Sequence, residues 1–477
     1  MKVGFAERDI TPEKGMEQPG GYGKAFHTGK VHDPCKVRVA VFEEGSDQVA
    51  LIGLDALMVP RSLVLAARRD IQAACGLRPE AVMMGASHSH SAGPLGMVQP
   101  GEFDHASDLV KHLAYDLSSC ADARYLQHVH QQLVAAVQEA YERRTEARCG
   151  VGSGHEDQVS FNRRFRMKNG LTYTHPGKGN PDIVEPAGPI DPEVGVLGAW
   201  DAAGRLLGCV VNFACHGTTG PGGTSADWIY YLEQTIRGVM GPEAIVVFLN
   251  GACGDVTQVN NLSPYGPEFG ERSARFVGGR VGAEAVKVLL SVEPGELVPV
   301  AARTRILAIP RRRPSPERLY RDLTLVQRDP SEVDPTEWTF AKETVLLEAI
   351  LAKEPVAEVE VQAVQVGPAV FLANPAEFFC QLGLDLKAGS PFPFTYPVEL
   401  ANGCVGYVPT PEALGEHGGG YETRLTAYSN LEVMAGPKIV QALLELAGEL
   451  TPGEVPTPPR VGEFQGAWTY GNVPPEP

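Results

Sequence analysis

The sequence lacks long apolar runs and any cysteine framework. None of its apolar stretches approaches the roughly 20 residues that a helix needs to cross a bilayer, so we expect no membrane span. Residues 1–9 read as a strand, without the apolar segment or cleavage site of a secretory signal. The nine cysteines are scattered and include no Cys-x-x-Cys pair, which argues against disulfides and against a thiolate zinc site. These absences predict a cytoplasmic protein with reduced thiols.

Positive charge is also scarce. The 41 Lys and Arg residues stand against 58 Asp and Glu residues, for a net charge of −17. Such a surface repels phosphate groups, so we expect no nucleic acid and no anionic membrane surface as a partner. Hydrophobic residues make up 43% of the 477 residues, which is enough for a large core that needs no metal ion to hold it together.

Strand-like and helix-like segments alternate along the chain. Short β-branched and apolar runs predict strands at 37–43, 48–53, 81–85, 194–200, 207–214, 244–249, 359–366 and 369–372. Helical spacing predicts helices at 60–75, 123–147, 227–240 and 271–290. The first two strands flank a Gly-Ser-Asp turn and should form a hairpin. The alternation predicts the α/β class, with a mixed β-sheet core flanked by helices.

Three segments fall outside this alternation. Residues 97–121 are irregular and follow a candidate site, as lids and substrate walls often do. Residues 167–192 are rich in Gly and Pro and are expected to form an ordered surface loop. Residues 451–477 carry seven prolines and should form an extended tail, which makes a homo-oligomer contact possible. We expect one domain over 1–450, followed by this tail.

The most informative motif is a pair of histidines after a predicted strand. His88 and His90 lie in Gly-Ala-Ser-His-Ser-His-Ser-Ala-Gly-Pro, residues 85–94, directly after the apolar run 81–84. In a strand, side chains two residues apart share a face, so both imidazoles are expected to converge on one point. Catalytic metal centres often begin this way.

Three further junctions between a strand and a loop carry polar groups. His216 follows the apolar strand 207–214, Thr257 follows the strand 244–249 through a glycine-rich turn, and Glu377 follows 369–372. Because ligands in open α/β sheets collect at the carboxyl ends of strands, we expect these groups to form one site with the histidine pair. Histidine and carboxylate ligands with one open position are typical of a hydrolytic zinc, which acts on amides, esters or lactones.

Each of these residues also has a purely structural interpretation. Read alone, His88 and His90 are more often hydrogen-bonded histidines of a core or loop than metal ligands. Glu377 could cap the helix that follows it. Thr257 could bind backbone amides in a turn, and Tyr407 could be a buried ring with a satisfied hydroxyl.

Several motifs occur in a fixed order from the N-terminus to about residue 430. They are Asp9-Ile10-Thr11-Pro12, Gly20-Gly21-Tyr22-Gly23, Ser87-His88-Ser89-His90-Ser91-Ala92-Gly93-Pro94, Phe161-Asn162-Arg163, His216-Gly217-Thr218, Asn374-Pro375-Ala376-Glu377, Gly406-Tyr407-Val408-Pro409-Thr410 and Tyr421. In this order they resemble the neutral ceramidases, zinc amidases that split the N-acyl bond of ceramide. One motif departs from that family: its Gly-Asp-Val-Ser-Pro-Asn reads Gly-Asp-Val-Thr-Gln-Val at 254–259.

The resemblance implies a zinc metallohydrolase in which metal-bound water attacks an amide carbonyl. The Zn²⁺ ligands that it implies are His88, His216, Glu377 and Tyr407. The catalytic residues that it implies are His90, with Tyr421 or Arg163, which stabilise the oxyanion and protonate the leaving group, and Thr257, which positions substrate or water.

The expected substrate is a soluble small amide rather than ceramide, because the chain ends before the immunoglobulin-like domain of the secreted ceramidases and shows no signal peptide. Three alternatives remain open. The same zinc centre could serve an esterase or lactonase. The protein could be a non-catalytic binding protein on a ceramidase-like fold, or the metal centre could be purely structural.

Overall fold

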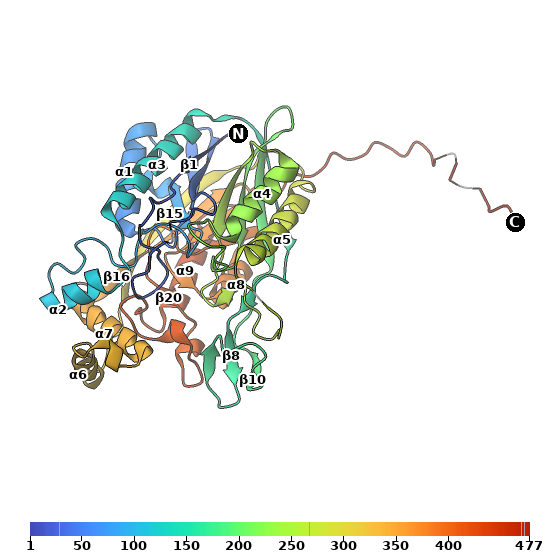
Figure 1. The fold of residues 1–477 in the computed structure, drawn as a ribbon. Helices are drawn as coiled ribbons and strands as arrows, with labels where there is room; N and C mark the ends of the chain where they lie inside the picture. Colours follow the sequence, from blue (N-terminus) through green and yellow to red (C-terminus); the bar gives the residue numbers. More distant parts are fainter. Residues whose placement is uncertain (28, 267, 469, 472) are drawn as a thin grey trace.

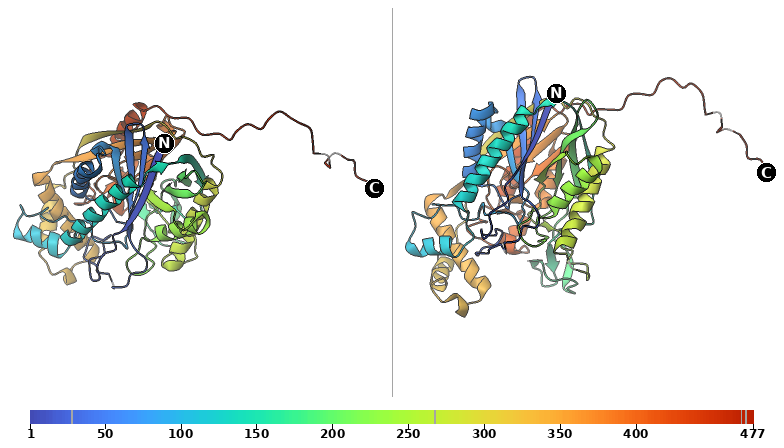
Figure 2. Two further views of the ribbon diagram at one scale, coloured as in Figure 1. Left: turned by 90° about the horizontal axis from the view of Figure 1, so that it is seen from above. Right: turned by 45° about the horizontal axis from the view of Figure 1, so that its top comes forward.

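The computed structural model describes residues 1–27, 29–266, 268–468, 470–471 and 473–477. Its core contains three sheets that pack against one another, with helices on the outside (Figures 1 and 2). This architecture confirms the α/β class and the mixed sheets flanked by helices that the alternating pattern predicts.

The first sheet has the strand order β4-β3-β2-β1-β5. Its strands are β1 (Lys2–Asp9), β2 (Lys36–Glu44), β3 (Asp47–Leu54), β4 (Val82–Ala86) and β5 (Thr145–Glu146). One face packs under α1 (Arg61–Cys75) and α3 (Ala123–Glu142), and the other faces the remaining sheets. The predicted hairpin is confirmed by β2 and β3, which pair antiparallel. β4 runs parallel to β3 and delivers the histidine motif at its carboxyl end.

The second sheet, β13-β12-β11-β6, is covered by two long helices. Its strands are β6 (Arg148–His155), β11 (Glu193–Trp200), β12 (Leu206–Phe213) and β13 (Ile245–Asn250), and its helices are α4 (Trp228–Met240) and α5 (Glu271–Leu289). The third sheet, β15-β16-β17-β19, carries the last two helices on its outer face. It contains β15 (Val300–Pro310), β16 (Val356–Val366), β17 (Ala369–Ala373) and β19 (Phe394–Val398), with α8 (Cys380–Gly389) and α9 (Ala435–Gly448).

Two projections extend from the lower part of the molecule in Figure 1. One consists of α2 (Asp108–Lys111), which continues as a π-helical turn over His112–Asp116, with α6 (Pro316–Leu325) and α7 (Pro335–Lys353). The other is a small sheet of order β10-β8-β9, made by β8 (Arg164–Met167), β9 (Thr172–Thr174) and β10 (Ile183–Pro186). Two short ladders join loops between the large sheets: β7 (Phe161–Asn162) with β14 (Val256–Thr257), and β18 (Glu377–Phe378) with β20 (Tyr407–Val408).

Two predictions about local structure are wrong. The helix predicted over 123–147 ends at Glu142, because Thr145 and Glu146 form β5 and pair with β1 instead of continuing the helix. The segment 167–192, expected to be a loop, contains β9 and β10, because both hydrogen-bond to β8. The Gly and Pro content of this segment predicted a loop, but pairing with β8 supplies backbone hydrogen bonds and makes strands of it.

The start of the tail is attached to the third sheet. The Gln365 amide donates a hydrogen bond of 2.7 Å to the carbonyl of Thr451, and the Gly453 amide donates one of 3.1 Å to Gly367. From there the chain extends away from the body of the protein (Figure 1). None of the helices in the described part of the chain is long and apolar enough to cross a membrane.

Candidate metal centre

The two histidines that follow β4 do converge, although not in the way that strand alternation predicts. β4 ends at Ala86, and His88 has a φ of 60°, in the left-handed region. A residue with a Cβ pays of the order of 1–2 kcal/mol for this conformation. The turn brings the rings of His88 and His90 to a centroid separation of 4.7 Å, with 3.2 Å between their Nε2 atoms. Local strain, rather than a shared strand face, therefore aims this pair.

His216 and Glu377 arrive at the same point from two other sheets. His216 follows β12, and its ring centroid lies 4.5 Å from that of His88. Glu377 begins β18 after β17, and its Oε2 atom lies 3.2 Å from His88 Nε2 and 3.3 Å from His216 Nε2. The helix α8 begins only at Cys380, so Glu377 does not cap it, and that structural alternative is wrong. The structure thus brings together residues separated by up to 289 positions along the chain, since 377 − 88 = 289.

The Nδ1 atoms of His88 and His216 are each held by a backbone carbonyl oxygen. His88 Nδ1 lies 2.8 Å from the carbonyl oxygen of Leu57, and His216 Nδ1 lies 3.0 Å from that of Val256. A carbonyl oxygen only accepts hydrogen bonds, so each Nδ1 must carry a proton and each Nε2 is left to face Glu377. Metal-binding histidines are oriented in this way by a second partner.

One carboxylate oxygen of Glu377 is buried without a hydrogen bond. Its Oε1 accepts a 2.7 Å hydrogen bond from the Tyr428 hydroxyl, whereas Oε2 has no such partner among the described residues. Four ligands about 2.0 Å from a tetrahedral zinc stand about 3.3 Å from one another. The separations of Oε2 from the two Nε2 atoms match that spacing, so these donors fit a metal ion of this kind.

His90 adds a third imidazole to the cluster. The ligand atoms of His88, His90 and His216 all lie within 4.8 Å of one another. The structure therefore offers one more imidazole than the sequence predicts as a ligand, since the resemblance assigns His90 to the substrate side. No metal identity follows from this geometry.

The electrostatics of the cluster favour a bound positive charge. Burial alone would raise the pKa of Glu377, but His88 and His216 outweigh burial and hold it well below its usual range. Burial and the neighbouring Arg163 lower the pKa of His216 to about 3. Burial also lowers the pKa of His90, as does the proximity of the other two imidazoles. Burial alone would lower the pKa of His88, but Glu377 outweighs burial and raises it. The ionised carboxylate thus favours a positive charge at this point, where a divalent cation would take the place of the proton on His88.

Arg163 organises the opposite wall of the site. Its Nε atom donates a 2.7 Å hydrogen bond to Glu422, and one terminal nitrogen donates to the hydroxyls of Tyr407 and Tyr421 at 3.1 and 3.0 Å. The two hydroxyls lie 2.5 Å apart. The other terminal nitrogen lies 3.2 Å from His216 Nε2. A fixed cation and two phenols thus border the space in front of the imidazoles, where an oxyanion would need donors.

Thr257 lies at the edge of this arrangement. Its hydroxyl accepts a 3.2 Å hydrogen bond from the amide of Val259, the one hydrogen bond of this hydroxyl recorded among the described residues. The preceding carbonyl, that of Val256, is the partner of His216 Nδ1. Thr257 therefore reaches the centre through the backbone, and a direct role for its side chain stays a prediction.

Sequence reasoning missed three residues that tie the ligands together, the partly buried Tyr428 and the buried Glu399 and Cys253. Tyr428 contacts Glu377, as described above. Glu399 accepts hydrogen bonds of 2.9 Å from the amides of Cys253 and Phe378 and from the Cys253 thiol, whose sulfur lies 3.4 Å from His216 Nδ1. Burial raises the pKa of Glu399 to about 8. Glu399 and Cys253 lie far apart along the chain and carry no local motif, so only the fold reveals them.

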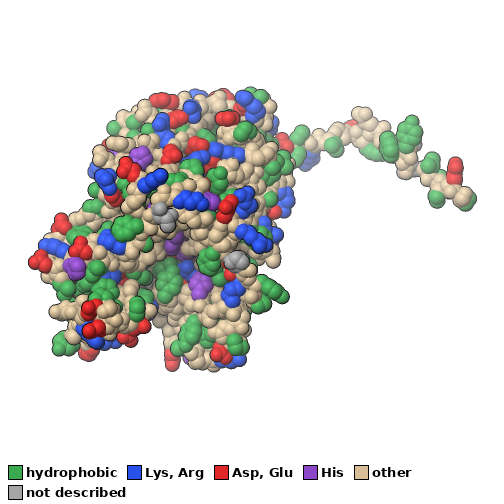
Figure 3. All heavy atoms as spheres, viewed as in Figure 1, with side chains coloured by type: hydrophobic (Ala, Val, Ile, Leu, Met, Phe, Trp, Pro, Cys, Tyr) green, Lys and Arg blue, Asp and Glu red, His purple; other side chains and the backbone are tan. Residues whose placement is uncertain are grey.

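Small cavities surround the cluster. A cup of about 50 Å³ is lined by Gly20, Gly21, Tyr22, Leu57, His88, His90, Met97, Glu377, Tyr407, Tyr421 and Tyr428. In the space-filling view, histidine side chains are visible in a hollow between the two lower projections (Figure 3). On one side an open groove of about 780 Å³ runs along 171–177 and 418–420 and shares Tyr421 with the cup.

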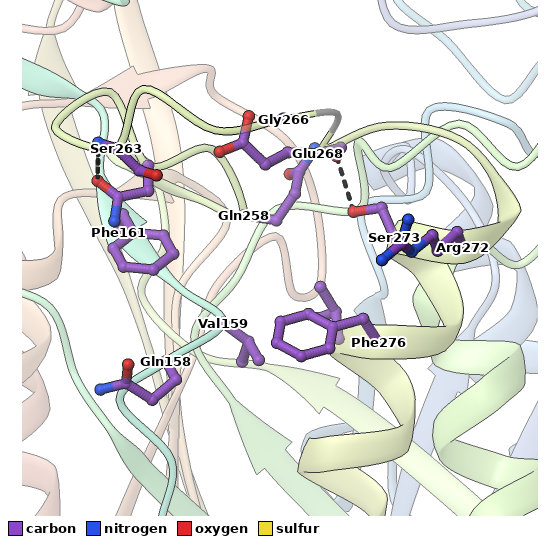
Figure 4. A pocket seen from close by; sticks show the side chains of 12 residues that line it. Gln158, Val159, Phe161, Gln258, Ser263, Gly266, Glu268, Arg272, Ser273 and Phe276 are labelled. Atoms are coloured by element: carbon purple, nitrogen blue, oxygen red, sulfur yellow. Dashed lines mark hydrogen bonds between the residues drawn. The ribbon is translucent and has the colours of Figure 1, made fainter. Parts of the chain in front are cut away.

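A separate cavity of about 320 Å³ lies beside α5. Phe161 and Phe276 stand on opposite walls, and the Ser273 hydroxyl donates to the carbonyl of Glu268 (Figure 4). Among the residues that the structure describes, no histidine and none of the residues predicted to act in the site line this cavity. This cavity is therefore distinct from the candidate metal centre.

By its fold and its site, the chain is an α/β protein with a buried cluster of histidines and a glutamate where three sheets meet. No family model matches the chain. The neutral ceramidase of Pseudomonas aeruginosa is 25% identical over 305 residues, which cover 60% of this chain and 42% of that protein. The match therefore spans less than half of the relative's length.

Solved structures extend the likeness over nearly the whole chain. The crystal structure of neutral ceramidase from Pseudomonas aeruginosa superposes with a TM-score of 0.70 at 21% identity, covering 98% of this chain and 78% of that one. A ceramidase complexed with C2 gives a TM-score of 0.67 at 19% identity and the same coverage. The chain therefore has the neutral-ceramidase fold, and the resemblance seen in the motifs is confirmed at the level of fold.

Proposed function

We propose that this protein is a zinc-dependent hydrolase that cleaves the carboxylic amide bond of a soluble small molecule. The observation that carries the proposal is the Oε2 atom of Glu377, which is buried without a hydrogen bond to the described residues and lies 3.2 and 3.3 Å from the Nε2 atoms of His88 and His216, the spacing of metal ligands. The relation to ceramidases supports amide hydrolysis as the reaction class.

The proposed ligands are His88, His216, Glu377 and Tyr407, with His90 near enough to join them. When bound, a divalent ion at this point would polarise the scissile carbonyl and acidify a water molecule. A buried carboxylate and two imidazoles are a donor set that zinc prefers, because the hard-metal alternatives require several carboxylates.

The surrounding side chains then have defined tasks. His90 lines the cup and is proposed to pass a proton to the leaving nitrogen. Burial lowers its pKa, which makes its protonated form a stronger acid toward that nitrogen. Arg163 stays charged and holds the hydroxyl of Tyr421 toward the space in front of the imidazoles. These donors would stabilise an oxyanion there. Thr257 is proposed to position substrate or water.

Metal content and hydrolysis test this proposal together. The purified chain should bind one zinc per molecule, measured by elemental analysis, and should hydrolyse N-acyl amides. A chelator should abolish hydrolysis while the far-ultraviolet circular dichroism stays unchanged. Zinc added back should restore activity. A protein without stoichiometric metal that still hydrolyses amides would contradict the metal-dependent mechanism.

The same experiment separates the alternatives. Esters and lactones assayed beside amides identify an esterase or lactonase. Bound zinc with no turnover of any of these substrates indicates a non-catalytic binding protein. Chelation that unfolds the chain indicates a structural metal.

A lipid amide is the second candidate substrate, because the relative is named a neutral ceramidase. Ceramide should therefore be assayed in detergent beside a water-soluble N-acyl amide. The small volume of the cup favours the soluble substrate.

A further inference from the structure

A second small cavity adjoins the cup at the metal centre. Both cavities are lined by Gly21, Tyr22, Met97 and Tyr428, so they share one wall. The second cavity, here called the side chamber, also has a volume of about 50 Å³. Its remaining lining comes from the insertion 97–121, from α7 and from Ala427.

The walls of the side chamber are mostly apolar. Val98 and Phe103 contribute from the insertion, and Leu346 and Ile350 contribute from α7. Phe103 and Leu346 are each 1% exposed and belong to one hydrophobic cluster that joins the insertion to α7. Residues of the segment 97–121 thus form part of the wall of the side chamber, next to the candidate metal centre.

The side chamber is lined by two carboxyl groups, those of Glu343 and Glu102. Glu343 forms a 2.8 Å ion pair with the buried Lys342, whose ammonium also donates to the carbonyl of Tyr22. Burial raises the pKa of Glu102. Since no free positive charge lines the chamber in the described part of the chain, a neutral group fits better than an anionic one.

The volumes limit what each space can hold. One water-sized atom needs about 10–15 Å³ of such space, so 50 Å³ accommodates about four non-hydrogen atoms. The cup is therefore filled by the scissile amide itself. Whatever is attached to the amide must extend beyond the cup, and the two spaces that share lining residues with the cup are the side chamber and the groove beside Tyr421.

The direction of the two arms follows from what lines the two spaces. Tyr421 lines both the cup and the open groove, and its hydroxyl is held by Arg163. The groove is open and lined by polar groups such as Thr172, Thr174 and Arg424, whereas the side chamber is lined mostly by apolar side chains, so a polar amine fits the groove and an aliphatic acyl group fits the chamber. The amine would accordingly lie toward the groove and the acyl group toward the side chamber.

We infer that the side chamber is the acyl subsite and that it selects a short, neutral aliphatic acyl chain, with about four non-hydrogen atoms beyond the carbonyl carbon. The inference rests on the proposed function, because it assumes that the scissile carbonyl sits in the cup. The amine part of the substrate lies in the open groove and is less restricted in size.

Binding of unbranched carboxylates to the zinc-loaded full-length protein tests the inference without requiring turnover. Acetate, butyrate, pentanoate, hexanoate, octanoate and dodecanoate are titrated by calorimetry. Each added methylene should tighten Kd about fourfold while the chamber fills, and affinity should stop rising at about five or six carbons in total. A steady rise through dodecanoate, or no dependence on chain length, would overturn the acyl subsite.

Two variants of α7 sharpen the experiment. Leu346→Ala enlarges the chamber. The chain length at which affinity stops rising, here called the break, should therefore increase by at least two carbons. Leu347→Ala is the matched control, because Leu347 is equally buried on the same helix but does not line the chamber. It should leave the break unchanged. An equal shift in both variants would indicate general loosening and would contradict the assignment.

Kinetics with N-acyl anilides of the same chain lengths distinguish the two proposals. If carboxylates bind with the expected break but no anilide is hydrolysed, amide hydrolysis fails while the subsite stands. If anilides are hydrolysed and long acyl chains are preferred, the hydrolase stands and the short-chain subsite fails.

Discussion

At the scale of single residues, the metal centre depends on orientation more than on residue type. His88 adopts a left-handed backbone, and backbone carbonyls hold the Nδ1 atoms of His88 and His216. Tyr428 fixes one oxygen of Glu377 and leaves the other directed at the imidazoles. The sequence names the histidines and the glutamate, but it does not name the partners that aim them.

Glu377→Gln tests the proposed ligand set. The glutamine amide has the same shape as the carboxylate but lacks the negative charge that attracts a divalent cation. Bound zinc should fall well below one per chain, and amide hydrolysis should fall at least about 100-fold, since groups that merely orient a ligand already account for losses of 10- to 100-fold. Glu445→Gln, at a surface position on α9, is the control and should retain full metal content. Unchanged zinc binding in Glu377→Gln would remove Glu377 from the ligand set.

Asp33 makes a specific contribution to the pH dependence of stability. It is 3% exposed, and its carboxylate accepts hydrogen bonds from the Ser225 hydroxyl and the Ala226 amide, at 2.5 and 2.7 Å. Burial, with the nearby Asp55 and Asp227, raises its pKa to about 7. Between about pH 4 and 7 the folded state therefore holds a proton that the unfolded state has lost, so stability falls as pH rises through this window.

Asp33→Asn should remove that loss, because the neutral amide can replace the protonated acid. The variant should match the wild type near pH 4 and exceed it above pH 7 by about 4 kcal/mol, the value for a shift of about three pKa units. Urea unfolding midpoints from pH 4 to 8 provide the measurement. Parallel pH profiles for both proteins would show that Asp33 is not the group responsible.

At the scale of secondary structure, the elements that the sequence predicts best are those with a complete local signal. The helix over 60–75 is an example: α1 spans Arg61–Cys75 and ends at Gly76, whose φ of 76° suits glycine. The amide of Gly76 donates to Gln72, which closes the last turn. Other elements were not predicted, among them β15, α7 and α9. For β9 and β10 the reason is clear, because both depend on pairing with β8 and local residue spacing does not encode strand pairing.

A buried ion cluster joins β2 to α4. The Arg38 guanidinium donates to Asp55 at 2.8 Å and also pairs with Glu233, and all three side chains are at most 2% exposed. Arg38→Met would leave two buried carboxylates without this partner and should lower the free energy of unfolding by about 3–5 kcal/mol. Urea unfolding checks the value. Arg275→Ala, which breaks an exposed i,i+4 pair on α5, should leave the unfolding midpoint almost unchanged.

At the scale of the whole molecule, the site exists because three sheets meet. β4, β12 and β17 belong to different sheets, and their carboxyl ends bring His88, His216 and Glu377 to one place. The two projections flank the site, since α7 lines the side chamber next to the cup and residues 171–177 line the groove that shares Tyr421 with it. Domain limits at residue 450 remain a prediction, as do the oligomeric state and the role of the tail.

Two truncations test how the tail relates to this assembly. Removing residues 458–477 should leave the unfolding midpoint unchanged, since the exposed apolar side chains there, such as Phe464 and Trp468, pack against little. Removing residues 451–477 also deletes the hydrogen bonds of Thr451 and Gly453 to the third sheet and should lower the midpoint. Sedimentation of the variant that lacks residues 458–477 tests the oligomer prediction, because an oligomer contact made by these residues would be lost.

The sequence by itself determined the fold class, the strands and helices of the first two sheets for the most part, and the order of the chemically active motifs, because these follow from hydrophobic periodicity and from short-range residue chemistry. The tertiary structure alone decided which distant groups meet, which carboxylate oxygen is left unpaired and how much space lies beside it. Those properties arise from contacts between sheets and loops far apart along the chain, and no local pattern encodes the distance between two such groups.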